Sequence, residues 1–127
     1  MMKHPALSLL AALSIALIST TIVGTSFKAK KLQHVVAFSY KPEITKEQQQ
    51  KVKQAFYALQ NDIPQIEAFE GDDDINPGKK KFTQCFVVSV KNEHDLNAYG
   101  SHPKHKAFSA MVDPMLAEVM VIDYWAK

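Results

Sequence analysis

An uncharged apolar run near the N-terminus most constrains what this chain can fold into. Residues 5–26 contain no Asp, Glu, Lys or Arg, and Lys3 precedes them. A short positive start followed by such a run is typical of a secretory signal peptide. Gly24 and Ser26 provide the small residues needed for cleavage before Phe27. We therefore predict that residues 1–26 are a signal peptide and that the protein is periplasmic or secreted.

The length of the same run leaves a second interpretation open. It is at the short end of what crosses a bilayer, so residues 1–26 could instead form an uncleaved N-terminal membrane anchor. Contact with a membrane is expected only in that case. Either way, about 100 residues remain, which is room for a single domain, and we place it at residues 32–127.

The amino-acid composition limits the classes of partner that this domain is expected to bind. All 15 basic residues are lysine. The planar guanidinium of Arg is the usual group for reading guanine and gripping phosphate, so we predict no nucleic-acid partner. The only cysteine, Cys85, cannot form an internal disulfide, and we expect a buried, inert strand thiol.

The first strand and helix are predicted by local pattern. Residues 34–40 are rich in β-branched and aromatic types and end just before Pro42, which indicates a strand followed by a turn. Thr45 and the Gln three residues later have the spacing of a helix capping box. Apolar residues then recur at helical intervals as far as Pro64, which predicts an amphipathic helix over residues 45–63.

The rest of the chain predicts the remaining elements. We expect strands at residues 66–71, 82–90 and 119–125, helices at residues 92–99 and 103–116, and an exposed loop at residues 71–81. The resulting β-α-β-β-α-β order predicts an α+β fold of the ferredoxin-like kind. In that fold a four-stranded antiparallel sheet carries its helices on one face.

Side-chain alternation in the first strand predicts a sheet that is covered on both faces. Alternate residues of a strand point to opposite faces. One set is His34, Val36, Phe38 and Tyr40, and the other is Val35, Ala37 and Ser39. Both sets contain apolar side chains, although helices are expected on one face only. We therefore predict a homodimer in which a second copy covers the other face.

Four short motifs in this region are typical of one known family. They are HVVAFSYKPEIT at residues 34–45, I-x-x-F-E-G at residues 66–71, Y-x-x-H-P-x-H at residues 99–105 and I-D-Y at residues 122–124. Together they resemble the stress-responsive A/B barrel (Dabb) family over about residues 32–124. The resemblance implies a Dabb domain at residues 32–127 and a dimeric α/β barrel, in which the sheets of two copies enclose the barrel.

A characterised branch of that family, the plant olivetolic acid cyclases, suggests site residues. By that resemblance, Tyr99 and His105 fall on the catalytic tyrosine and histidine, and His34 falls on a pocket histidine. A neutral imidazole can remove a proton next to a carbonyl, and a phenol can donate a hydrogen bond to the enolate oxygen that develops. Gln84 stands where the cyclases have another pocket histidine, and an amide cannot act as a base.

Three classes of function remain open. We favour a dimer that binds a small apolar or aromatic ligand between sheet and helices. The expected ligand-binding residues are Val36, Phe38, Phe56, Gln84, Phe86, Val88 and Val121. One alternative is a cyclase or lyase that uses His105 and Tyr99, and another is a structural stress-response dimer without a ligand. Monooxygenases of the antibiotic-biosynthesis type are a further possibility by fold analogy alone.

Neither a metal nor another cofactor is predicted. His102 and His105 are three residues apart but lack a third ligand, and we expect His102 to cap a helix. The run of three aspartates at residues 72–74 imitates the start of a calcium loop. Pro77, however, stands where that loop requires glycine.

Overall fold

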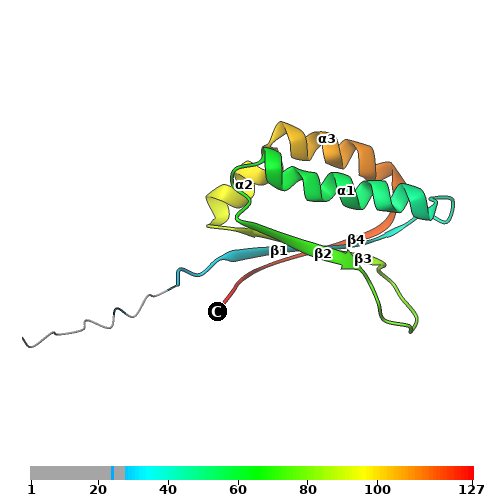
Figure 1. The fold of residues 1–127 in the computed structure, drawn as a ribbon, viewed down its shortest axis with the longest axis horizontal. Helices are drawn as coiled ribbons and strands as arrows, with labels where there is room; N and C mark the ends of the chain where they lie inside the picture. The colour runs from blue at the N-terminus through cyan, green and yellow to red at the C-terminus, as the bar shows by residue number, and fades with distance from the viewer. Residues whose placement is uncertain (1–23, 25–27) are drawn as a thin grey trace, which may run out of the picture.

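The computed structural model describes residue 24 and residues 28–127, so the predicted signal peptide lies outside the described residues except for Gly24. The elements are β1 (Leu32–Tyr40), α1 (Lys46–Asp62), β2 (Ala68–Asp73), β3 (Gln84–Val90), α2 (Glu93–Ser101), α3 (Pro103–Val112), the 3-10 helix η1 (Asp113–Met115) and β4 (Leu116–Trp125) (Figure 1). The predicted β-α-β-β-α-β order is confirmed, with the second helical region divided into α2 and α3.

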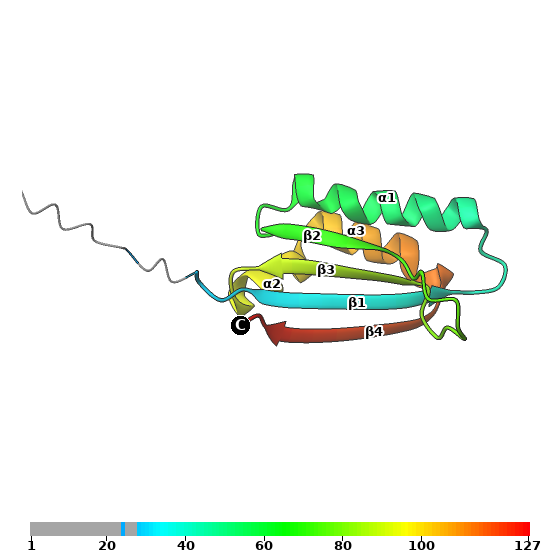
Figure 2. The same cartoon turned by 60° about the horizontal axis from the view of Figure 1, so that its bottom comes forward.

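The four strands form one antiparallel sheet in the order β2-β3-β1-β4. The helices lie on one face of this sheet, and the opposite face is left open (Figures 1 and 2). The order makes β4 an edge strand beside β1. This arrangement confirms the predicted ferredoxin-like α+β fold.

Helix α1 begins and ends where its local sequence requires. Thr45 and Gln48 form a capping box, because each side chain accepts a hydrogen bond from the backbone N–H of the other, at 2.8 and 3.2 Å. Val52, Phe56 and Leu59 then recur at helical spacing and are all buried against the sheet. The helix ends at Asp62, one residue before the predicted end, and Ile63 is already extended ahead of Pro64.

An aromatic core fills the space between the helices and the inner strands. The Phe86 ring lies 5.6 Å from that of Phe38 and 4.8 Å from that of Phe56, and Phe56 in turn stacks on Phe108 at 4.5 Å. The edge strand is less well covered. Val119 and Val121 of β4 point to the helical face but are 52% and 51% exposed. The helical layer therefore leaves a hollow over β4.

The end of α3 differs from the sequence-based prediction. The predicted helix over residues 103–116 stops at Val112, and β4 begins at Leu116, three residues before the predicted strand. Pro114 explains the difference, because it has no backbone N–H for the next helical hydrogen bond. The chain makes one 3-10 turn there and enters the strand early.

The open face of the sheet is uncovered and carries a group of apolar side chains. Cys85 points to this face and is exposed, so its predicted burial is wrong for the single chain. The reason is the alternation of side chains along β3. Gln84, Phe86 and Val88 point to the helices, so Cys85 between them points to the other face. Ile122 and Tyr124 of β4 lie on the open face and are each 49% exposed.

Gly71 marks a point of close approach between β2 and β3. Its backbone φ of +151° is one that residues with a side chain rarely adopt. A Cβ at this position would meet the carbonyl oxygen of Cys85 and lie 2.6 Å from Cα of Phe86. The strand pairing therefore requires glycine here.

Candidate functional site

A cavity of about 240 Å³ lies in the hollow between α3 and the edge strand β4. Its polar lining includes His34, Tyr99 and His105, which come from β1, α2 and α3. An outer hollow of about 520 Å³ shares these three residues and adds Asp123 and Lys106. The three residues singled out by the family resemblance thus meet at one place, where the inner and outer hollows adjoin.

Tyr99 has the most unusual environment of the three. Its side chain is 1% exposed, yet its hydroxyl finds no hydrogen-bond partner among the described residues. Burial raises the pKa of the phenol, so it stays protonated at neutral pH and remains a donor. A buried donor without a partner costs about 1–3 kcal/mol, which makes this hydroxyl a candidate to bind a ligand in the cavity.

His105 is held in one tautomer by the end of α2. Its Nδ1 lies 3.1 Å from the carbonyl oxygen of Gly100. A carbonyl can only accept, so Nδ1 carries the proton and Nε2 is left as an acceptor. Burial lowers the pKa of His105 and outweighs the hydrogen bond to Gly100, which acts in the opposite direction. The ring is therefore neutral at pH 7, and it lies 4.5 Å from the ring of Tyr99.

His34 is positioned by a residue that sequence reasoning did not select. The strand register places His34 opposite Asp123, and Nδ1 lies 2.6 Å from the carboxylate Oδ1. A carboxylate can only accept, so Nδ1 of His34 carries a proton and donates it to Asp123. The rings of His34 and Tyr99 also pack in a T-shaped arrangement, with their centroids 5.7 Å apart. The I-D-Y motif of the sequence contains Asp123, but only the strand register shows that its partner is His34.

The predicted ligand-binding residues divide into two groups. Val36, Phe56 and Val121 line the cavity. The other four lie in the packed core outside this lining and are at most 2% exposed: Phe38, Gln84, Phe86 and Val88. Their predicted contact with a ligand does not follow from this geometry.

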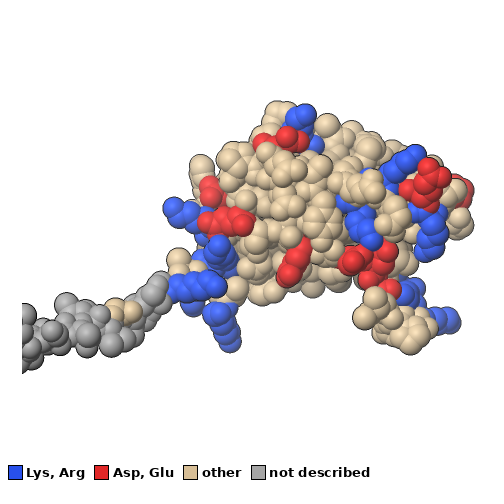
Figure 3. Space-filling view, in the orientation of Figure 1, with Lys and Arg blue, Asp and Glu red and all other residues tan. Residues whose placement is uncertain are grey.

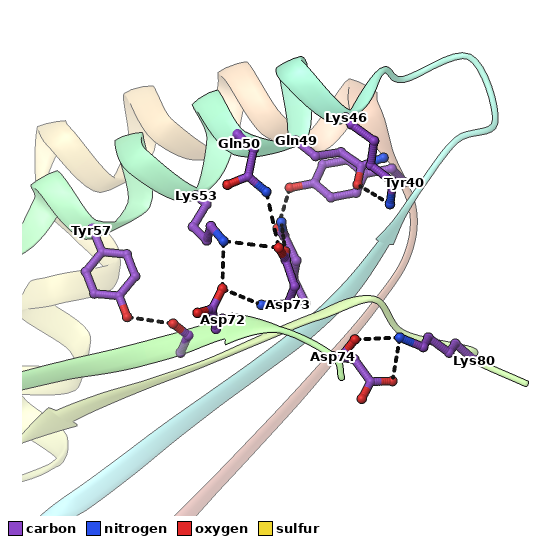
Figure 4. Close-up of polar contacts among 12 residues, drawn as sticks. Tyr40, Lys46, Gln49, Gln50, Lys53, Tyr57, Asp72, Asp73, Asp74 and Lys80 are labelled. Carbon is purple, nitrogen blue, oxygen red and sulfur yellow. Dashed lines mark hydrogen bonds and ion pairs between the residues drawn. The ribbon is translucent and has the colours of Figure 1, made fainter. Parts of the chain in front are cut away.

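Gln84 has a structural role in the core instead. Its amide donates to Asp73 at 2.8 Å and accepts from the Tyr40 hydroxyl at 2.6 Å. Lys53 reaches the same carboxylate at 3.1 Å, and it also contacts Asp72 at 2.6 Å (Figure 4). The network ties the far end of the sheet to α1, away from the cavity.

The predicted structural role of His102 is confirmed, because its Nδ1 accepts from the backbone N–H of Lys104 at 3.1 Å and caps α3. Over residues 28–127, His, Cys, Asp and Glu form no group of three or more that could hold a metal ion. None of the helices in this part of the chain is long and apolar enough to cross a membrane.

Charges of both signs are interspersed on the molecular face shown in Figure 3. Lysines lie both where the described chain meets the grey segment and at the opposite end of the molecule.

The chain is similar to one protein family and to several solved structures. A family model described as Stress responsive A/B Barrel Domain matches residues 32–126. No curated protein gives a significant match. A dimeric ferredoxin-like protein of unknown function from Thermobifida fusca is 24% identical, with a TM-score of 0.71 over 80% of this chain and 96% of that one.

Two further structures have the same fold. A protein from Arabidopsis thaliana is 24% identical, with a TM-score of 0.70 over 76% of this chain and 95% of that one. Hydroxynitrile lyase from Passiflora edulis is 18% identical, with a TM-score of 0.73 over 79% of this chain and 96% of that one.

Proposed function

The chain belongs to the stress responsive A/B barrel domain family, and from that premise we propose that it is an exported homodimer that binds a small apolar or aromatic ligand. The ligand lies in the cavity between β4 and α3. The observation that carries this proposal is the hydroxyl of Tyr99, which is buried beside the cavity and has no hydrogen-bond partner in the described part of the chain. A ligand that accepts from this hydroxyl would satisfy it, and the apolar lining would hold the rest of the ligand.

The homodimer is supported by the open face of the sheet. Ile122 and Tyr124 are half exposed there; Ile122 faces Val35 on β1, which in turn faces Val87 on β3. Burying apolar surface of this kind is worth about 25 cal/mol per Å². The similar protein from Thermobifida fusca is described as dimeric.

Export is supported by the sequence of residues 1–26 alone. Mass spectrometry of the protein from its native host tests this part of the proposal. A mature chain that begins at Phe27 supports a cleaved signal peptide, and an intact N-terminus in the membrane fraction supports the anchor.

An enzyme of the lyase or cyclase type is the second candidate. It is favoured by the meeting of a neutral imidazole, His105, with the protonated phenol of Tyr99 in one cavity. Such a pair can move a proton to or from a ligand atom that lies between them. A hydroxynitrile lyase has the same fold, although a similarity at 18% identity shows a shared fold and not a shared activity.

A thermal-shift screen tests the binding proposal. Purified protein is heated with aromatic acids, β-diketones, quinones and short acyl compounds, with Tyr99→Phe and His105→Ala in parallel. A ligand at 100 times its dissociation constant adds about 2.7 kcal/mol, a rise on the order of 10 °C for a domain this small. We expect such a rise with one class, weakened in both variants.

Two other results separate the alternatives. Turnover of a ligand that stops in His105→Ala while binding persists would favour the enzyme. No rise with any class, together with variants as stable as the parent, would favour a structural dimer without a ligand.

A further inference from the structure

The hydrogen-bonding groups of the cavity specify more about the ligand than its apolar character. Tyr99 contributes a hydroxyl that stays protonated and has no partner among the described residues. The nearest polar rings are His105 and His34, with centroids 4.5 and 5.7 Å from that of Tyr99. A ligand atom between these rings meets a donor on one side and imidazole nitrogens on the other.

The tautomers of both histidines follow from their outer partners. The carbonyl of Gly100 and the carboxylate of Asp123 are acceptors, at 3.1 and 2.6 Å from the Nδ1 atoms of His105 and His34. Each Nδ1 therefore donates outward, and the neutral ring of His105 keeps Nε2 as an acceptor. The cavity thus offers its ligand a donor, the Tyr99 hydroxyl, and an acceptor, Nε2 of His105.

The charge of the inner cavity opposes an anionic ligand. No lysine is among its lining residues, whereas Asp113 is one of them. Lys106 lines the outer hollow, which it shares with Asp123. A carboxylate that moves into the inner cavity would lose its hydration without gaining a lysine as its partner.

The volume limits the size of the ligand. A cavity of about 150 Å³ is enough for benzene, so about 240 Å³ accommodates one aromatic ring with a short substituent. Val36, Phe56 and Val121 provide apolar contacts for such a ring.

We propose that the inner cavity takes an uncharged alcohol or phenol of single-ring size. Its hydroxyl accepts a hydrogen bond from Tyr99 and donates one to Nε2 of His105. A hydroxyl group can do both, whereas a carbonyl can only accept and an ionised carboxylate can only accept at the cost of desolvation. The inference rests on the proposed binding function and names the chemical class of the ligand.

NMR titrations of the purified full-length chain with benzyl alcohol, toluene and benzoate test this proposal. The three probes share one ring and differ in their polar group. We expect benzyl alcohol to bind about tenfold more tightly than toluene, as one net hydrogen bond predicts, and benzoate to bind more weakly than either. If benzoate binds the unmodified protein most tightly, or if benzyl alcohol binds it no more tightly than toluene does, the proposal is overturned.

Two variants locate the effect. Tyr99→Phe should reduce the affinity for benzyl alcohol to that for toluene and leave toluene unchanged. Tyr124→Phe, on the open face of the sheet, should leave all three affinities unchanged. An advantage for benzyl alcohol that survives in Tyr99→Phe would contradict the assigned donor.

The toluene titration separates this inference from the function on which it rests. Binding of toluene without an advantage for benzyl alcohol would retain the apolar site and reject the hydroxyl ligand. Failure of all three probes to bind would reject both.

Discussion

His34 on β1 and Asp123 on β4 face each other across neighbouring strands, with Nδ1 of the imidazole 2.6 Å from the carboxylate. This pair turns Nδ1 of His34 toward Asp123 and places a proton on that nitrogen. The strand register, and not a local motif, brings the two residues together. Asp123 is therefore a positioning residue, since it acts on the cavity through His34.

Asp123→Asn should weaken the control of the His34 tautomer. A neutral amide holds the imidazole less firmly than a carboxylate does, so the population with the proton on Nε2 should rise. Long-range proton–nitrogen NMR of the ring measures this population. His94, whose side chain is 90% exposed, serves as an internal reference and should not change. An unchanged His34 spectrum would show that Asp123 does not set the tautomer.

Gly71→Ala should destabilise the fold, because the new Cβ would meet the backbone of β3 and the φ is unfavourable for alanine. We expect a loss of at least about 2 kcal/mol in the free energy of unfolding, measured in urea. Gly100→Ala is the matched control, because a Cβ there has open space and the residue lies in α2. It should be neutral or stabilising by about 0.5–1 kcal/mol. Equal losses in both variants would contradict the close approach at Gly71.

The order of the elements could be predicted from local sequence signals, whereas their exact ends and the site could not. The capping box at Thr45 and the apolar spacing that follows are sufficient to define α1. Pro114 was also a local signal, but the helical pattern around it concealed the end of α3. Val36 and Phe38 share one face of β1, so parity predicts the same role for both. Only Val36 lines the cavity, because the ring of Phe38 packs instead against Phe56 and Phe86 in the core.

Asp73 should make the stability of the fold depend on acid pH. Partial burial raises the pKa of this carboxyl, but hydrogen bonds from Gln84, Lys53 and Gln50 outweigh it and hold the pKa below its usual value. A lowered folded-state pKa gives stability that is complete above the unfolded value of about 3.9 and is lost as pH falls through the folded value. Urea unfolding from pH 7 to pH 2 should therefore show Asp73→Asn less stable than the parent at pH 7, with the difference gone at pH 2. A difference that is constant with pH would contradict this role.

Ile122→Lys should dissociate the proposed homodimer, because it places a charge on the open apolar face. Light scattering at micromolar concentration should show a dimer for the parent and a monomer for this variant. Ile75→Lys makes the same change at a side chain that is 96% exposed in the loop between β2 and β3, and it should remain dimeric. A monomeric parent, or a dimeric Ile122→Lys, would contradict an interface on this face.

Tyr99→Phe tests the central claim most directly, because it removes one hydroxyl and keeps the ring in the core. The free energy of unfolding and the ligand-induced shift of the melting temperature are measured on the same protein. If the hydroxyl is held for a ligand, the unliganded variant should be as stable as the parent or more stable, and the ligand-induced shift should largely disappear. A variant that loses about 1 kcal/mol of stability and keeps the full ligand-induced shift would show that the hydroxyl serves the fold and not a ligand.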